Sequence, residues 1–208
     1  MSDEETSGAD VSGADALARA RTAVADAVAA LDAAHARTEV LAEYEPARRV
    51  FGVKRSARLR PMGRVWRLGV LALDEEGGLW AHGNVVRAEK PAIRSITANS
   101  VAVHRAYRAA AVKGGIAEGE TVVFDAVPVA LDGRLLEPAE PGEPVDPAGP
   151  AAPTAGAQPA ASADSPVVVQ DGEVFVRWRA GDPSALAPFE PYLRERVDLL
   201  AHPTASDD

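Results

Sequence analysis

The stretch RVWRLGVLALDEEGGLWAHGNVVRA, residues 64–88, decides the fold class of this chain. Two apolar runs, 64–73 and 79–88, flank the acidic segment 74–78, whose two glycines can take the positive φ that a tight connection needs. Apolar residues alternate with others along the first run, namely Trp66, Leu68, Val70 and Ala72. Because alternate side chains of a strand point to one face, the pattern predicts a β-hairpin with one buried face.

Upstream, residues 14–45 are rich in alanine and contain no glycine or proline, which predicts one long N-terminal helix. Four apolar residues of this segment fall at helical spacing on one stripe: Leu17, Val24, Val28 and Leu31. The stripe spans about two heptads, fewer than a coiled coil usually has. We therefore expect the helix to pack against a sheet, with a short coiled coil as the alternative.

Three other segments are expected to form β structure. The motif PMG at 61–63 separates two strand-like runs and resembles a hairpin connection. Residues 120–133 predict one or two strands. Residues 167–178 predict a hairpin centred on Asp171 and Gly172, a dipeptide that suits a tight turn.

Two further helices follow from capping signals and apolar spacing. A middle helix is predicted between Asn99 or Ser100, which are good N-caps, and Gly114, which is a typical terminator. A C-terminal helix is predicted within 184–200 and should begin near Pro188 or Pro191, because proline is tolerated only in a first turn.

The order of elements predicts an α+β fold, with a mostly antiparallel sheet and a long N-terminal, a middle and a C-terminal helix. The segment 137–165 consists mainly of proline, alanine, glycine and acidic residues, which is typical of a disordered linker. The expected organisation is a disordered tail (1–13), a main domain (14–136), the linker (137–165), a hairpin and helix that pack back on the main domain (166–201), and a second tail (202–208).

Composition excludes several classes of chemistry. The 208 residues carry a formal net charge of −9 and contain no cysteine, so disulfides and thiolate nucleophiles are excluded. The first residues are acidic and are followed by no apolar leader, and no apolar run reaches the ~18 residues of a membrane span. We expect a soluble cytoplasmic protein without a membrane partner.

The motifs of common active sites are also missing. The glycine clusters at 77–78 and 114–119 match neither the Walker A nor the dinucleotide-binding pattern. The four histidines occur in different predicted elements without the spacing of a metal site: His35, His82, His104 and His202. No general acid and base can be identified. We therefore expect no metal and no cofactor, and the catalytic residues of any activity stay unknown.

The blocks GRVWRLGVLALDEEGGLWAHGNVVRA and HRAYRAAAVKGGIAEGETVVFD, together with VVVQDGEVFVRW, resemble a group of uncharacterised actinobacterial proteins, some of which carry the label glutaminase. The resemblance covers roughly residues 45–135 and 166–201 and implies amide hydrolysis. A serine-dependent glutaminase would need a Ser-x-x-Lys pair, in which the lysine takes the proton of the serine hydroxyl. The residues three positions before the only lysines, Lys54, Lys90 and Lys113, are Phe51, Arg87 and Ala110.

The most unusual feature is a basic stretch, residues 48–69, which holds eight Lys or Arg and no acid. Arg58 and Arg60 are expected to share one strand face, and Arg64 to lie across the 61–63 turn from Arg60, so that the three cluster in space. One interpretation is internal compensation, in which carboxylates of the N-terminal helix or the linker neutralise these arginines. The other is an anion site, since the planar guanidinium can donate two hydrogen bonds to a phosphate or carboxylate.

The leading hypothesis is a noncatalytic interaction or anion-binding protein whose contact set is Arg58, Arg60, Arg64 and Arg67. An acidic protein or a small anion is the expected partner. Long nucleic acid is a poorer fit, because the isoelectric point near 5.0 means that the rest of the chain repels a polyanion. The alternative is a small amide hydrolase with unidentified catalytic residues, and the oligomeric state is open.

Overall fold

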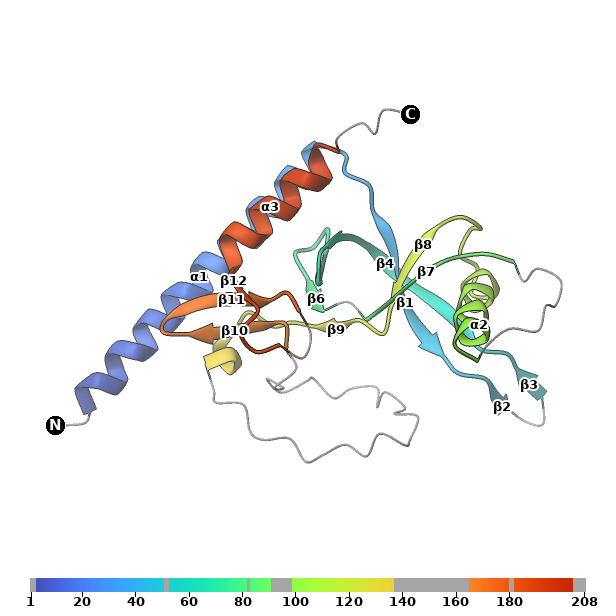
Figure 1. The fold of residues 1–208 in the computed structure, drawn as a ribbon, viewed down its shortest axis with the longest axis horizontal. Helices are drawn as coiled ribbons and strands as arrows, with labels where there is room; N and C mark the ends of the chain where they lie inside the picture. Colours follow the sequence, from blue (N-terminus) through green and yellow to red (C-terminus); the bar gives the residue numbers. More distant parts are fainter. Residues whose placement is uncertain are drawn as a thin grey trace.

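The computed structural model describes residues 3–50, 53–81, 83–90, 99–136, 165–179 and 182–203, so the predicted linker lies outside the described residues except for Ser165. It confirms the α+β class (Figure 1). The three predicted helices are present as α1 (Asp3–Ala33), α2 (Asn99–Lys113) and α3 (Phe189–Ala201), and a short 3₁₀ helix, η1, spans Gly133–Leu136.

The strands form one large and two small sheets. The large sheet has the order β7-β8-β1-β4-β5-β6-β9 and is antiparallel except between β1 and β8. Its strands are β1 (Glu39–Glu45), β4 (Arg58–Leu68), β5 (Leu71–Asp74), β6 (Leu79–Ala81), β7 (Asn84–Arg87), β8 (Thr121–Phe124) and β9 (Val127–Pro128). The small sheets are β10 (Val167–Gln170) with β11 (Glu173–Arg177) and β12 (Leu186–Pro188), and β2 (Arg48–Val50) with β3 (Val53–Arg55).

The large sheet bends at two places, where one strand ends and the next strand of the chain begins almost at once. Only two residues separate β6 from β7, and only two separate β8 from β9. Gly83 occupies the first bend, where a side chain would collide with the backbone of Asp125. Asp125 occupies the second bend with a φ of 54° and accepts a hydrogen bond from Asn84 at 2.9 Å. The pairs β6–β9 and β7–β8 are thus two halves of the same bent ribbon.

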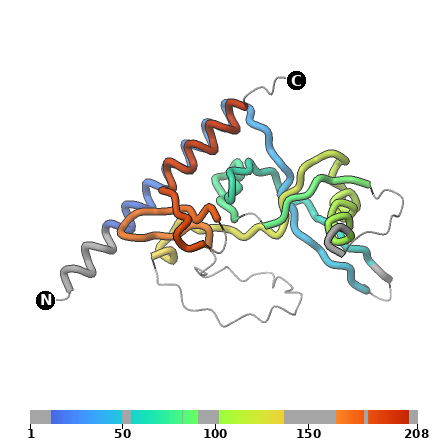
Figure 2. Tube along the Cα trace, viewed as in Figure 1, coloured from blue at the N-terminus to red at the C-terminus, as the bar shows by residue number. Residues whose placement is uncertain are grey.

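One hydrophobic core joins the two ends of the chain. Leu17 and Leu31 of α1 pack with Leu68 of β4 and with Phe189 and Leu193 of α3 in a single buried cluster. The two helices lie side by side, as Figures 1 and 2 show. A second cluster lies between α2 and the strands β1 and β8, where Phe124 is fully buried. The apolar stripe of α1 therefore packs against strands, as expected, and also against α3, which was not expected.

The predicted helix over 14–45 is wrong in its last part. The helix α1 ends at Ala33, and His35 then adopts a φ of 49° while the Ala36 amide donates to the Leu31 carbonyl at 2.9 Å. This left-handed ending reverses the chain. Residues 39–45 form β1 instead, because tertiary pairing with β4 and β8 overrides their helix propensity. At its other end the helix begins at Asp3, within the expected tail.

One predicted turn is absent, and one turn that was not predicted is present. The strand β4 continues through residues 61–63, where a hairpin was expected. Leu41 pairs with Gly63 and Ala42 pairs with Pro61, so Met62 is the extra residue of a β-bulge. A bulge accommodates Pro61, which lacks an amide hydrogen. Conversely, the run 64–73 is broken by a turn at Gly69, whose φ is 70°. The hairpins at 74–78 and 171–172 are confirmed.

The turn at Gly69 changes which side chains share a face. Trp66 and Leu68 belong to the core under α1, as predicted. Ala72 packs instead with Leu41, Val65 and Val123 on the opposite face of the sheet. The expectation that Ala72 shares the face of Trp66 is therefore wrong, since it assumed one uninterrupted strand.

Candidate anion-binding ribbon

The arginines at the start of β4 face glutamates at the end of β1. Arg58 Nε donates to Glu45 at 2.7 Å, and Arg60 forms a salt bridge with Glu43 while its Nε lies 3.2 Å from the other oxygen of Glu45. The hydrogen bond from Arg58, and the positive charges around it, hold the pKa of Glu45 below its ordinary value even though partial desolvation opposes the shift. Both guanidinium groups are therefore compensated within the chain.

The other two predicted contact residues are also paired. Arg67 donates from Nε and Nη2 to the two carboxylate oxygens of Glu39, at 3.0 and 3.1 Å, in a side-on geometry that uses the whole fork. Arg64 donates to the Thr38 hydroxyl at 2.6 Å and to the Thr38 carbonyl at 3.1 Å, and it lies 3.4 Å from Glu120.

The bulge at Met62 separates Arg64 from its expected neighbours. Arg58, Arg60 and Arg67 pair with glutamates of β1 that share one face of the strand with Leu41. Arg64 points to the other face, where Trp66 donates from Nε1 to the Ala36 carbonyl. The expectation that Arg64 joins Arg58 and Arg60 in one cluster is wrong, because β4 continues through residues 61–63 and its extra residue puts Arg64 on the other face from Arg60.

These contacts favour internal compensation for the four arginines of β4. Three of the carboxylates, those of Glu39, Glu43 and Glu45, lie within residues 14–45, the segment that was expected to supply them, but they belong to β1 and not to a helix. The fourth, Glu120, lies in the segment before β8, which was not expected to contribute. A helix over residues 39–45 would not align these glutamates with the arginines of β4, whereas the strand does. Glu39, Leu41, Glu43 and Glu45 are every second residue of this segment, and this spacing is the signal that could have identified it as a strand with its glutamates on one face.

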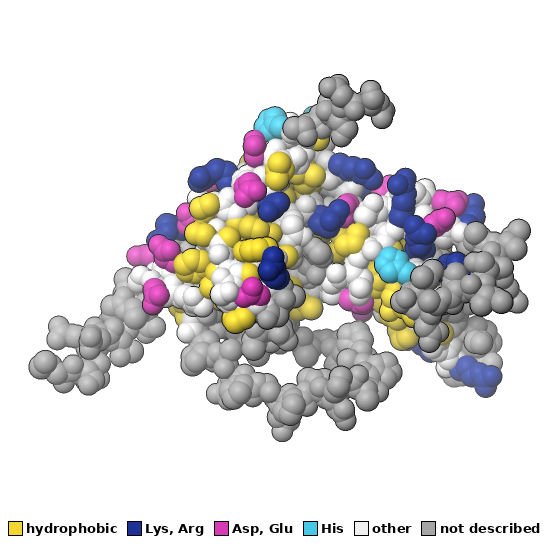
Figure 3. Space-filling model, in the orientation of Figure 1, with side chains coloured by type: hydrophobic (Ala, Val, Ile, Leu, Met, Phe, Trp, Pro, Cys, Tyr) yellow, Lys and Arg dark blue, Asp and Glu magenta, His cyan; other side chains and the backbone are white. Residues whose placement is uncertain are grey.

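The uncompensated part of the basic stretch is the β2–β3 ribbon, residues 48–50 and 53–55, which extends from the end of β1 at one extremity of the molecule (Figure 1). Its register places Arg48 opposite Arg55 and Arg49 opposite Lys54. Like charges directly opposite one another in a sheet are unfavourable. Figure 3 shows dark blue Lys and Arg side chains at this extremity.

Three guanidinium groups of the ribbon are exposed: those of Arg48, Arg49 and Arg55. Within the described part of the chain, none of the three forms a salt bridge. Arg48 acts only at longer range on Glu45, whose carboxylate already binds Arg58 and Arg60. The ribbon therefore presents positive charge that the described residues leave free for another molecule.

An aromatic cluster stabilises the strand from which the ribbon extends. The Tyr44 ring lies edge-on to Tyr107 of α2, with centroids 5.3 Å apart, and Tyr107 lies 4.9 Å from Phe124 of β8. Burial raises the pKa of Tyr44, and the nearby Tyr107 and Asp125 add to that increase. The end of β1 is thus fixed against α2 immediately before the ribbon begins.

A second polar feature of the surface lies beside Arg64. A groove of about 560 Å³ beside Arg64 is lined by both signs of charge, with Arg37 and Arg64 facing Glu118 and Glu120. Among the residues with assigned positions, no three His, Asp or Glu side chains lie close enough to hold a metal ion. Likewise, none of the described helices is long and apolar enough to cross a membrane.

No known protein family, curated protein or solved structure matches this chain. The resemblance to glutaminase-labelled proteins and the activity it implies therefore stay predictions.

Proposed function

We propose that this protein is a noncatalytic binding protein that docks an acidic segment of another protein, or a small anion, on the β2–β3 ribbon. The observation that carries the proposal is the pair of like-charged cross-strand neighbours, Arg48 with Arg55 and Arg49 with Lys54, in a part of the chain whose described guanidinium groups form no salt bridge. A bound carboxylate or phosphate would relieve that repulsion and accept hydrogen bonds from the arginine forks.

The arginines of β4 play a supporting part in this proposal. Their side chains are already engaged by Glu39, Glu43, Glu45 and Glu120, so a ligand would have to displace a carboxylate to reach them. The ion pairs between Arg58 and Glu45 and between Arg60 and Glu43 instead join β1 to β4 immediately beside the ribbon. The proposed contact residues are therefore Arg48, Arg49 and Arg55 of the ribbon. They replace the set expected from the sequence, which was Arg58, Arg60, Arg64 and Arg67.

An acidic protein segment or a small anion fits the charge distribution better than long nucleic acid. The whole chain carries −9, so a polyanion that extended beyond the ribbon would meet net negative charge. A short acidic segment can end within the ribbon, which spans only residues 48–55. We expect weak binding that decreases steeply as salt is added, because exposed charges are screened over about 10 Å at 0.1 M salt.

Binding of a fluorescent poly-glutamate peptide at low salt tests this proposal. The triple variant Arg48→Gln, Arg49→Gln, Arg55→Gln should lose most of the binding and most of its salt dependence. The matched control, Arg37→Gln, Arg87→Gln, Arg179→Gln, removes the same charge from exposed positions outside the ribbon and should keep the binding. Equal loss in both variants would point to net charge rather than to the ribbon.

Two further measurements separate the alternatives. A single-stranded oligonucleotide that binds more tightly than poly-glutamate, through the same three arginines, would replace the acidic protein with nucleic acid. Ammonia release from glutamine above a buffer control would overturn the noncatalytic assignment and support the amide hydrolase.

A further inference from the structure

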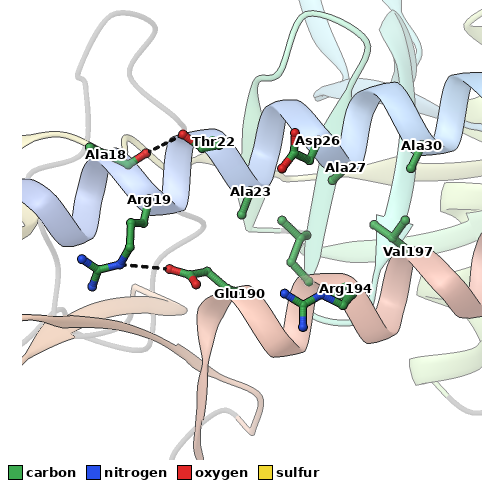
Figure 4. Close-up of a pocket in the computed structure, with 11 residues that line it drawn as sticks. Ala18, Arg19, Thr22, Ala23, Asp26, Ala27, Ala30, Glu190, Arg194 and Val197 are labelled. Atoms are coloured by element: carbon green, nitrogen blue, oxygen red, sulfur yellow. Dashed lines mark hydrogen bonds and ion pairs between the residues drawn. The ribbon is translucent and has the colours of Figure 1, made fainter.

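The outer surface of α1 and α3 contains an apolar groove. The two helices run parallel, so that Arg19 lies beside Glu190 and the chain advances in the same direction along both helices (Figure 4). The groove between them has a volume of about 540 Å³ and is lined largely by small or apolar side chains. These are Ala18, Thr22, Ala23, Ala27, Ala30, Leu193 and Val197.

Charges of alternating sign border this groove. On α1, Arg19 is followed two turns later by Asp26, and on α3, Glu190 is followed one turn later by Arg194. Arg19 and Glu190 form a salt bridge of 3.5 Å at one end of the groove. Asp26 and Arg194 are exposed and, within the described residues, form no salt bridge. The groove therefore carries unused charges of both signs beside an apolar floor.

The order of charges along these helices is complementary to the same order in a second copy that runs antiparallel. If a second α1 packs antiparallel across the first with its centre between Thr22 and Ala23, Arg19 of each copy lies opposite Asp26 of the other. The same operation about Tyr192 places Glu190 of each copy opposite Arg194 of the other. A two-fold interface requires this self-complementarity, because each contact must occur twice.

We propose that two copies of this chain form a symmetric dimer through this groove, with α1 and α3 of each copy in a four-helix bundle. The overlap covers residues 12–33 of both α1 helices, about 33 Å at 1.5 Å per residue. The alanines allow the helices to approach to the usual interaxial distance of about 8–10 Å. The proposal is independent of the β2–β3 ribbon, which lies at the other end of the molecule (Figure 1).

A cross-linking experiment on the full chain tests the geometry directly. The protein has no cysteine, so a single introduced cysteine can form a disulfide only between copies. Thr22→Cys lies next to the proposed two-fold axis and should give a cross-linked dimer on a nonreducing gel. Ala29→Cys, on the same helix but not part of the groove lining, should stay monomeric on the gel. Equal cross-linking of both variants, or none at Thr22→Cys, would overturn this geometry.

Analytical ultracentrifugation over a concentration series tests the dimer itself. We expect a species of twice the 21.7 kDa chain mass. Asp26→Arg should raise its dissociation constant by at least about tenfold, because it places two arginines opposite each other twice. Reversing all four charges (Arg19→Glu, Asp26→Arg, Glu190→Arg and Arg194→Glu) should restore the dimer, because every pair regains opposite signs.

Circular dichroism of each variant separates loss of the dimer from loss of the fold. A wild-type chain that stays monomeric at every concentration would overturn the proposal. So would a dimer that persists unchanged in Ala23→Arg, a substitution that fills the groove, provided that this variant is folded.

Discussion

Arg58 Nε lies 2.7 Å from a carboxylate oxygen of Glu45, its direct neighbour across the β1–β4 pair. A negatively charged strand and a positively charged strand thus lie side by side, although the sequence places them in separate acidic and basic segments. The pairing leaves the adjacent ribbon of β2 and β3 as the uncompensated part of the basic stretch.

The pH dependence of stability should depend on Glu45. Because the pKa of Glu45 is lower in the folded chain than its ordinary value of 4.5, its stabilisation is complete at neutral pH and is lost as the pH falls through the lowered value. Glu45→Gln should lower the melting temperature at pH 7, and the difference from the wild type should shrink as the pH falls below 4.5. Melting curves between pH 2 and 8 check this. The control Glu173→Gln, at an exposed position, should show no such convergence.

Gly114 should not tolerate a side chain. A Cβ there would overlap the carbonyl oxygen of Leu59 in β4, which belongs to rigid backbone. Gly114→Ala should reduce the free energy of unfolding by about 1–3 kcal/mol, measured by urea denaturation. Gly133→Ala, where nothing lies within 4 Å of the added atom, is the matched control. Similar effects at both positions would contradict the close packing of α2 on β4.

Removing the Phe189 side chain should destabilise the whole protein. Phe189 is 1% exposed and shares one core with α1 and β4, although the predicted linker separates it from both in sequence. Phe189→Ala should cost about 3–5 kcal/mol and keep a single transition in urea, followed by tryptophan fluorescence. Leu199→Ala, on the exposed side of α3, should change stability by less than about 0.5 kcal/mol. Two separate transitions would instead show that the C-terminal segment folds by itself.

Tyr44 should titrate later than a free tyrosine. Because burial raises the pKa of Tyr44 above 10.0, the unfolded chain loses this proton first, and the contribution of Tyr44 to stability is lost as the pH rises through the raised value. An absorbance titration at alkaline pH should show a late phenolate step that Tyr44→Phe removes. Tyr192→Phe should leave this step in place.

The sequence predicts the middle and C-terminal helices and the hairpins at 74–78 and 171–172 well, because capping residues and turn residues act locally. Asn99 and Gly114 bound α2 as expected, and Asp171 with Gly172 forms the expected turn. The main errors involve residues whose state depends on distant partners. Residues 39–45 have acceptable helix propensity, and only pairing with β4 and β8 makes them a strand.

The site was harder to predict than the fold, since charge compensation requires knowledge of register. The bulge at Met62 sends Arg64 to a different face from Arg60. Alternation along the sequence alone cannot show this change, because a bulge is defined by the partner strand. The excess of arginine is visible in the sequence, but which arginines lack a partner depends on which glutamates lie across from them.

The bends at Gly83 and Asp125 have a consequence for behaviour at high concentration. By dividing two long strands, they leave the large sheet with the edge strands β7 and β9, which are four and two residues long. Short edges offer few unpaired amides to a neighbouring chain, so they are poor templates for growth by strand addition. Straightening either bend would lengthen that template and favour aggregation.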